Sequence, residues 1–201
     1  MHIAIVHDAV ADSDAPDAKD VLVQADALAG ALERLGHTVC RLACTLDLAA
    51  VTRALDDRRV ELVFNLVESI DGQGRLIHLL PYCLDAVPLP YTGAPAQAML
   101  LSSNKTLAKD WMAAAGIATP PWVGPWPGGS ERINGGDDTP RRWIVKSVWE
   151  HASIGLGPQS LVADAGRRAV HGLLAQRSGA LGGACYAEAF VDGREFNLSI
   201  L

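Results

Sequence analysis

The sequence predicts a fold of two parts, a parallel α/β domain at the N-terminus followed by an α+β domain with an antiparallel sheet. Over the first 66 residues, short apolar runs alternate with amphipathic helical stretches, an order that favours a parallel sheet with right-handed crossovers. The second half instead has strand-like runs between turn signals, and Asp192-Gly193 is its strongest hairpin signal.

The elements of the first part follow from local patterns. His2–His7 is an apolar run that suits a buried parallel strand. Apolar residues recur at steps of three and four over positions 21–35, which predicts a helix, and Gly36 can cap it in the left-handed conformation. The further expected elements are strands over Thr38–Ala43 and Glu61–Leu66 and helices over Leu46–Arg58 and Pro81–Ala86.

The second part begins after a change of character at Gly93-Ala94-Pro95. Pro95 opens a helix to about Leu101, and the polar side chains of residues 102–104 can cap another helix, Lys105–Ala115. The later expected elements are strands at Trp122-Val123, Trp143–Val148, Ala184–Val191 and Arg194–Leu201, a helix over Asp164–Ala175 and a loop over Gly124–Arg142. We therefore predict domains over residues 1–95 and 96–201.

Composition and charge narrow the classes of function. A formal charge of −6 disfavours a nucleic-acid partner. No apolar run approaches the roughly 18 residues of a membrane span, and the N-terminus lacks the basic region of a secretion signal. We therefore expect a cytoplasmic protein with neither a nucleic-acid nor a membrane partner. All of the excess negative charge lies in residues 1–100, which carry net −7, whereas residues 101–201 carry net +1. The second half is therefore the less repulsive place for a polyphosphate.

Three features of the second half are candidates for chemistry. Lys146 lies within a strand-like run, on the face opposite to Val145. The small-residue loop at 150–157 would let backbone N–H groups approach an anion, although it lacks the Walker A spacing. Glu188 and Glu195 flank the hairpin turn, so both can face one cavity. Taken singly, each feature has an ordinary reading as an edge lysine, a turn or exposed acids.

These three features belong to a longer series of motifs whose order and spacing are informative. They are Lys105, Ala115-Gly116-Ile117-Ala118-Thr119-Pro120-Pro121, Ile144-Val145-Lys146, Ser153-Ile154-Gly155 and Glu188 with Asp192-Gly193-Arg194-Glu195-Phe196. In order and spacing they resemble the ATP-grasp domain of D-alanine–D-alanine ligases. Phe64-Asn65-Leu66-Val67-Glu68 and Pro88-Leu89-Pro90-Tyr91-Thr92-Gly93 resemble the same family. The resemblance implies a Rossmann-like pre-ATP-grasp domain followed by an incomplete ATP-grasp domain.

The resemblance also implies an activity and residue roles. In such ligases ATP phosphorylates a carboxylate, and an amine attacks the resulting acyl phosphate. Lys105 and Lys146 would contact the ATP phosphates, and the loop Glu150–Gly157 would close over them, with Ser153 as the catalytic candidate. Glu188 and the backbone of Ala189–Val191 would hold adenine, while Glu195 would bind the ribose. The implied ATP-binding set is Lys105, Lys146, Glu150, Ser153, Ile154, Gly155, Glu188, Ala189, Phe190, Val191 and Glu195.

Two segments depart from the family on the amine side. Residues 7–14 lack the Gly-Gly-x-Ser-x-Glu stretch whose Glu helps to bind the first amino acid. Leu66-Val67-Glu68 stands where D-alanine ligases commonly have a His-Gly pair. We therefore leave the amino acid open, with Asp8 and Glu68 as candidates to meet its amine and a solvated loop acid as the ordinary alternative.

The family's Mg²⁺ ligands lie in segments that follow the hairpin. We expect no metal ligands within this chain and Mg²⁺ ligands beyond residue 201, so the chain is expected not to turn over alone. The implied partners are ATP and an amino acid, and a homodimer is open. The alternatives are a truncated, non-catalytic nucleotide- or amino-acid-binding module, and a doubly wound binding protein whose ligand contacts lie in the first half only.

Overall fold

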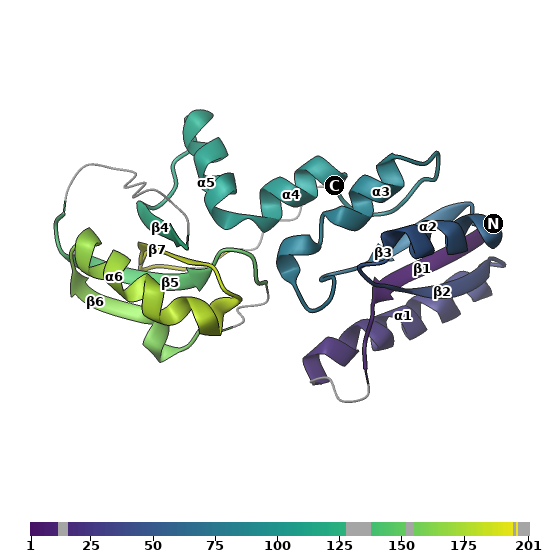
Figure 1. Cartoon of the computed structure of the whole chain (residues 1–201), viewed down its shortest axis with the longest axis horizontal. Coiled ribbons are helices and arrows are strands. Elements are labelled where there is room, and N and C mark those ends of the chain that lie inside the picture. The colour runs from purple at the N-terminus through teal and green to yellow at the C-terminus, as the bar shows by residue number, and fades with distance from the viewer. Residues whose placement is uncertain (12–15, 128–137, 152–154, 195, 197–201) are drawn as a thin grey trace. The chain divides into compact units, whose positions relative to one another are not determined.

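A computed structural model of the chain describes residues 1–11, 16–127, 138–151, 155–194 and 196. These residues form two compact units, Met1–Asn104 and Lys105–Leu201 (Figure 1). The helix α4 (Ala96–Ser103), which the sequence analysis assigned to the second domain, belongs to the first unit. The division at residue 95 stays a prediction about functional domains. Among the helices that the structure describes, none is long and apolar enough to cross a bilayer.

The first unit is built on a parallel sheet in the order β2-β1-β3. Its strands are β1 (His2–Asp8), β2 (Thr38–Cys44) and β3 (Leu62–Leu66), and Tyr91 extends the sheet through a parallel bridge to Val63. Its further helices are α1 (Pro16–Arg34), α2 (Leu48–Asp57), the short 3-10 helix η1 (Gly74–Leu76) and α3 (Leu79–Asp85). The predicted parallel α/β architecture is confirmed.

Both faces of this sheet are covered, as a parallel sheet requires. Alternate residues of β1 point to opposite sides. Ile5 packs with Ala25 and Ala29 of α1, whereas Val6 packs with residues of α2 such as Leu55. Figure 1 shows α1 and α2 on the two sides of the sheet. The first crossover leads from β1 to β2 on one side, and the second leads from β2 past β1 to β3 on the other. The carboxyl ends of β1 and β3 therefore form a topological switch point.

The second unit is an antiparallel sheet in the order β4-β7-β5-β6. Its strands are β4 (Trp122–Trp126), β5 (Arg141–Ser147), β6 (Leu161–Ala165) and β7 (Cys185–Ala189). Its helices are α5 (Lys105–Ala114), α6 (Arg167–Arg177) and the 3-10 turns η2 (Pro158–Ser160) and η3 (Ser178–Leu181). The predicted antiparallel layer with helices is confirmed.

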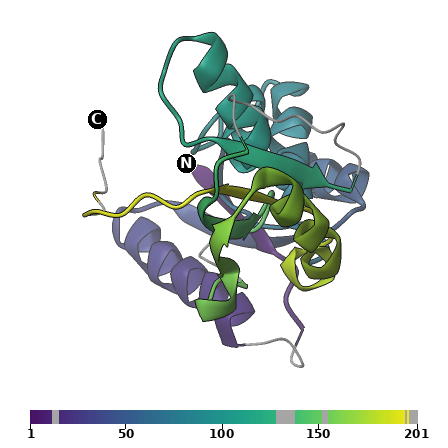
Figure 2. The same ribbon diagram turned by 90° about the vertical axis from the view of Figure 1, so that its left-hand side faces the viewer.

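A core under α6 holds one face of this sheet. Leu174 of α6 packs with Trp143 and Val145 of β5, and all three are fully buried. Gly124 of β4 permits this approach, because a Cβ there would lie 3.0 Å from the Leu174 side chain and 3.2 Å from the Tyr186 backbone. Figure 2 shows α5 and α6 on different sides of the sheet. The face away from α6 carries the candidate site.

Two expectations for this unit need correction. Residues 161–165 form the edge strand β6, and the helix that was expected from Asp164 begins at Arg167. The strand prevails because β6 pairs with β5, and the indole Nε1 of Trp143 donates to the Ala165 carbonyl at 2.7 Å. In addition, β4 continues to Trp126, into the segment expected to be a loop. Most of the expected strand Arg194–Leu201 lies outside the described residues.

The helix α2 ends in a hydrogen-bonded motif that places Arg59 in the left-handed backbone conformation. The N–H of Val60 donates to the Leu55 carbonyl at 3.1 Å, and the N–H of Arg59 donates to the Asp56 carbonyl at 2.8 Å. These two bonds form a Schellman motif, in which the residue after the cap is left-handed and is usually glycine. Here that residue is Arg59, at φ +50°.

We expect Arg59→Gly to raise the free energy of unfolding by about 1 kcal/mol, because glycine adopts this conformation without a Cβ clash. Arg58→Gly is the matched control: Arg58 has φ −88°, so the substitution is expected to destabilise the protein by about 0.5–1 kcal/mol. Urea unfolding followed by circular dichroism measures both. Equal losses of stability in the two variants would contradict the strain at Arg59.

Candidate functional site

The Glu188 carboxylate lies between two lysine ammonium groups on the face of the sheet away from α6. Its Oε1 is 2.5 Å from Nζ of Lys146, and its Oε2 is 2.7 Å from Nζ of Lys109. The register explains the first contact: Glu188 pairs with Ile144, so Lys146 is its diagonal neighbour on the same face. The second contact comes from α5, which brings Lys109 to the same carboxylate.

Lys109 is a member of this cluster that was not predicted from the sequence. It is buried, and its Nζ also donates to Oγ1 of Thr119 at 2.6 Å and to the Pro120 carbonyl at 3.3 Å. The sequence contains one sign that Lys109 is buried: it lies one helical turn after Thr106, on the same face of α5. That signal was too weak alone, because a lysine on a short helix usually faces solvent.

The charges in this cluster shift the pKa values of its members. Burial raises the pKa of Glu188, but the hydrogen bonds and charges of Lys109 and Lys146 outweigh it and leave the pKa below its ordinary value. Burial and the nearby Lys146 ammonium lower the pKa of Lys105, against the opposing charges of Glu150 and Glu188. Nζ of Lys105 donates to the Glu150 carbonyl at 2.7 Å. Thus four of the predicted residues share one electrostatic environment.

Of the other residues predicted to bind ATP, Ala189 and Phe190 use their backbone N–H groups within the protein. The N–H of Ala189 donates to the Pro121 carbonyl at 2.8 Å, and the N–H of Phe190 donates to the Arg142 carbonyl at 2.9 Å. Adenine contacts from these two residues would therefore have to use their carbonyls. The Arg142 guanidinium lies 4.7 Å from the centroid of the Phe190 ring, and Val191 is exposed.

The small-residue loop is described only in part. Gly155 has φ +74°, and a Cβ there would lie 2.6 Å from the Leu181 side chain. This position therefore accepts glycine alone without a shift of its neighbour. The predicted residues Ser153, Ile154 and Glu195 lie outside the described residues.

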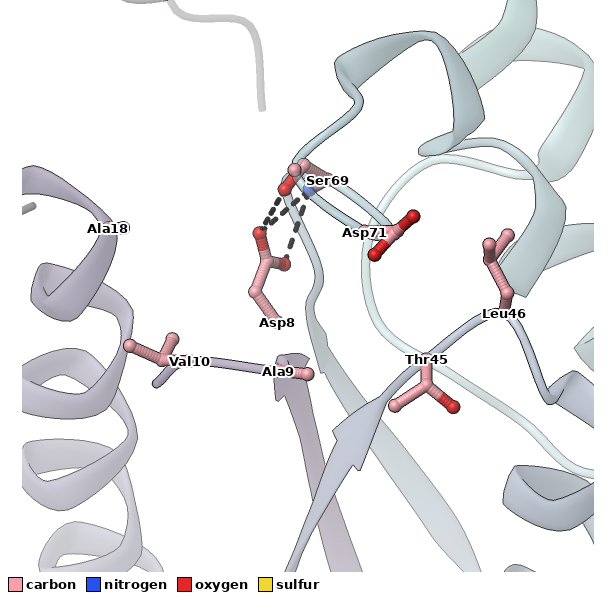
Figure 3. Close-up of a pocket in the computed structure, with 9 residues that line it drawn as sticks. Asp8, Ala9, Val10, Ala18, Thr45, Leu46, Ser69 and Asp71 are labelled. Atoms are coloured by element: carbon pink, nitrogen blue, oxygen red, sulfur yellow. Dashed lines mark hydrogen bonds between the residues drawn. The ribbon is translucent and has the colours of Figure 1, made fainter. Parts of the chain in front are cut away.

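A second candidate site lies at the carboxyl end of β1, at the switch point of the parallel sheet. The Asp8 carboxylate accepts hydrogen bonds from the N–H of Ser69 at 3.0 Å and from Oγ of Ser69 at 2.6 Å (Figure 3). It also accepts one from the N–H of Glu68 at 2.8 Å. Asp8 therefore holds the loop after β3 against β1. The Glu68 side chain is exposed.

A cavity of about 490 Å³ lies beside Asp8 (Figure 3). Its lining residues are Asp8, Ala9, Val10, Ala18, Thr45, Leu46, Ser69, Asp71 and Gly72. Asp71 was not predicted, although Asp-Gly is the dipeptide typical of a type I′ turn. Asp71 and Gly72 have φ +54° and +66°, and Ile70 and Gln73 close the turn with two backbone hydrogen bonds. This turn carries the Asp71 carboxylate at the cavity.

The described part of the chain does not assemble a set of metal ligands. Within residues 1–11, 16–127, 138–151, 155–194 and 196, no group of three or more His, Cys, Asp or Glu side chains is arranged to hold a metal ion. The described residues thus do not fit a Mg²⁺ site by themselves, since a hard cation needs several oxygen ligands.

Comparisons with known proteins identify the relatives of the chain, although no protein-family model matches it. It is 28% identical over 184 residues to a D-alanine–D-alanine ligase of Rhizorhabdus wittichii, covering 90% of this chain and 54% of that protein. A D-alanine–D-alanine ligase of a Caulobacter species is 31% identical over 184 residues, covering 90% of this chain and 52% of that protein. The chain is related to the D-alanine–D-alanine ligases. It spans about half the length of these curated relatives.

Solved structures of D-alanine–D-alanine ligases share the fold. The enzyme from Bacillus anthracis matches with a TM-score of 0.68 at 14% identity, over 96% of this chain and 58% of that one. The same enzyme complexed with ATP matches with a TM-score of 0.69 at 13% identity, over 96% of this chain and 60% of that one. These structures show the shared fold, and with the curated relatives they confirm the predicted relationship to D-alanine–D-alanine ligases over the matched part.

The Glu188 cluster predicts a pH-dependent contribution to stability in this ligase relative. We expect Glu188→Gln to lower the free energy of unfolding by about 3 kcal/mol at pH 7, because the buried Lys109 ammonium and the partly exposed Lys146 ammonium lose their carboxylate. Since folding lowers the pKa of Glu188, its contribution is complete above the ordinary glutamate pKa of about 4.3. It is lost as the pH falls through the lowered value.

Urea unfolding of wild type and Glu188→Gln at pH 7, 4 and 3 measures this difference, which should shrink in acid. Asp192→Asn is the control in the same unit, because Asp192 pairs with Arg142 at the exposed surface, where an ion pair contributes at most about 1 kcal/mol. A Glu188→Gln variant as stable as wild type at pH 7 would contradict the prediction.

Proposed function

We propose that the chain is the nucleotide- and amino-acid-binding part of an ATP-dependent carboxylate–amine ligase of the D-alanine–D-alanine ligase type. The observation that carries the proposal is the convergence of Lys105 and Lys146 with Glu150 and Glu188. The relationship to these ligases over 90% of the chain supports the same reading. In the proposed reaction a carboxylate oxygen attacks the γ-phosphorus of ATP and ADP leaves. The amine nitrogen then attacks the acyl carbon and phosphate leaves.

The lysine cluster fits the phosphate side of this reaction. Transfer of a phosphoryl group depends on positioning and on the neutralisation of negative charge by groups held in place. Lys105 is half-buried and lies near a second ammonium, and both effects lower its pKa. The negative charge of an arriving polyphosphate would counteract this lowering. Closure of the loop Glu150–Gly157, the catalytic role of Ser153 and the ribose contact of Glu195 stay part of the proposal, as does the adenine contact of Glu188 and residues 189–191.

Mg²⁺, when bound, would supply further charge neutralisation to the phosphates. No step is assigned to residues of this chain through the metal, because the described residues do not fit it. The inability to turn over alone and the cytoplasmic location stay predictions, and a homodimer stays open.

The cavity beside Asp8 is the proposed place of the amino-acid substrate. Ligands of open parallel sheets bind at the carboxyl ends of the strands, near a switch point. Among the described residues that line this cavity, two are carboxylates and none is Lys or Arg, which favours a ligand with an ammonium group. Asp8 is committed to the loop after β3. We therefore add Asp71 to Asp8 and Glu68 as a candidate to meet the amine.

ATP binding tests the nucleotide side. We expect Lys105→Ala and Lys146→Ala each to weaken the binding of ATP to the 201-residue protein about tenfold or more, since hydrogen bonds between charged partners contribute about 1.5–3 kcal/mol. Isothermal titration calorimetry measures the dissociation constants. Arg168→Ala, on the exposed face of α6, removes the same charge and should change binding less than twofold. Unchanged binding in both lysine variants would favour a binding protein whose contacts lie in the first unit.

Amino-acid binding tests the cavity. We expect Asp71→Asn to abolish binding of the preferred member of a panel of D- and L-amino acids, because the neutral amide cannot compensate an ammonium charge. Asn tolerates the same left-handed backbone, so the turn should persist. Asp20→Asn, on exposed α1, is the control. Chemical-shift changes report the binding, and N-acetyl amino acids that bind as well as the free ones would contradict an ammonium site.

Activity distinguishes the ligase from the non-catalytic alternative. Amino-acid-dependent release of ADP is assayed with this chain and with the full reading frame that contains it. Release by the full frame supports the ligase. ATP binding without any such release from the full frame would support a nucleotide- or amino-acid-binding module instead.

A further inference from the structure

We propose that Lys109 is a permanent counter-ion for Glu188, which allows Lys146 to leave that carboxylate and meet an entering phosphate. The inference rests on the proposed binding of ATP at Lys105 and Lys146, and it deepens that proposal. Lys109 would be a positioning residue without any contact to the nucleotide. The site would thus exchange one partner of Glu188 and keep the other.

The two lysines differ in how firmly they are held. An ammonium group has three donors, and Lys109 directs its Nζ to three acceptors: Glu188 at 2.7 Å, Thr119 at 2.6 Å and Pro120 at 3.3 Å. Its side chain is only 6% exposed. The Lys146 side chain is 29% exposed, and its ammonium meets the other oxygen of the same carboxylate. Lys109 is therefore fixed, and Lys146 is the partner with access to solvent.

Burial makes the second partner necessary. The Glu188 side chain is 12% exposed, and a carboxylate in such a place that loses its only counter-ion is strongly unfavourable. If Lys146 were alone with Glu188, its transfer to a phosphate would carry that penalty and weaken nucleotide binding. Because Lys109 stays on Oε2, Glu188 remains ionised and paired during the transfer. Two ammonium groups and one carboxylate also leave a surplus positive charge for the phosphate.

A double-mutant cycle separates this role from a structural one. Lys109→Met keeps the length of the side chain and removes its charge, so Lys146 becomes the only partner of Glu188. We expect this variant to bind ATP about tenfold more weakly than wild type. In Lys109→Met/Glu188→Gln no carboxylate holds Lys146, so binding should return to within about threefold of Glu188→Gln. Lys109→Arg, which keeps the charge, should bind within about threefold of wild type.

Calorimetry gives the four dissociation constants, and Arg168→Met controls for loss of a positive charge elsewhere in the unit. A double variant that binds about tenfold more weakly than Glu188→Gln would overturn the inference, because the loss would then not depend on the Glu188 carboxylate. Wild-type binding in Lys109→Met would also overturn it and leave the proposed function standing. If the wild type itself fails to bind ATP, both proposals are overturned.

A measurement on the wild type does not depend on how the variants fold. Side-chain nuclear magnetic resonance follows the Nζ groups of the two lysines during titration with ATP. We expect the Lys146 signal to move with saturation while the Lys109 signal and the ionised Glu188 carboxyl stay constant. Equal movement of both lysine signals, or protonation of Glu188 on binding, would overturn the inference even with ATP bound.

Discussion

The paired burial of the Glu188 carboxylate is the interaction on which the second unit depends. A carboxylate with this little access to water needs opposite charges at hydrogen-bond distance, and Glu188 receives them from β5 and from α5. The pairing therefore ties a helix to the face of the sheet that α6 leaves open. The same contact places Lys146, with Lys105 nearby, where a polyphosphate would find positive charge. The Glu188 carboxylate thus both holds α5 on the sheet and positions a lysine of the candidate site.

A carboxylate also organises the first unit, through hydrogen bonds to a loop. Asp8 lies at the end of the central strand, and its oxygens hold the backbone of Glu68 and Ser69. A carboxylate used in this way shapes the cavity through the loop that it fixes. The nearby turn carries Asp71, a second carboxylate, at the same cavity. In both units, therefore, one acid organises the structure and a neighbouring group has access to the candidate ligand.

The relationship to D-alanine–D-alanine ligases combines a retained fold with low sequence identity. At 14% identity to the Bacillus anthracis enzyme, the TM-score is still 0.68. Hydrophobic cores tolerate many exchanges of one apolar residue for another if the volume and the alternation along the strand are kept. A strand such as β1, whose alternate residues pack into two cores, can therefore keep its place in the sheet while its sequence changes. Residues 7–14 and 66–68, which the resemblance assigns to the amine side, depart from the family's motifs.

The sequence by itself determined the parallel α/β class of the first unit, the strands that carry Lys146 and Glu188, and the family resemblance. Periodicity and motif spacing are local properties of a chain. Tertiary structure alone decided that residues 161–165 form an edge strand against Trp143. It also decided that Lys109 meets Glu188 and that Asp8 is committed to a loop, which leaves Asp71 at the cavity. These outcomes depend on hydrogen bonds and charges between segments far apart in sequence. No local pattern specifies which distant partner will satisfy a buried polar group.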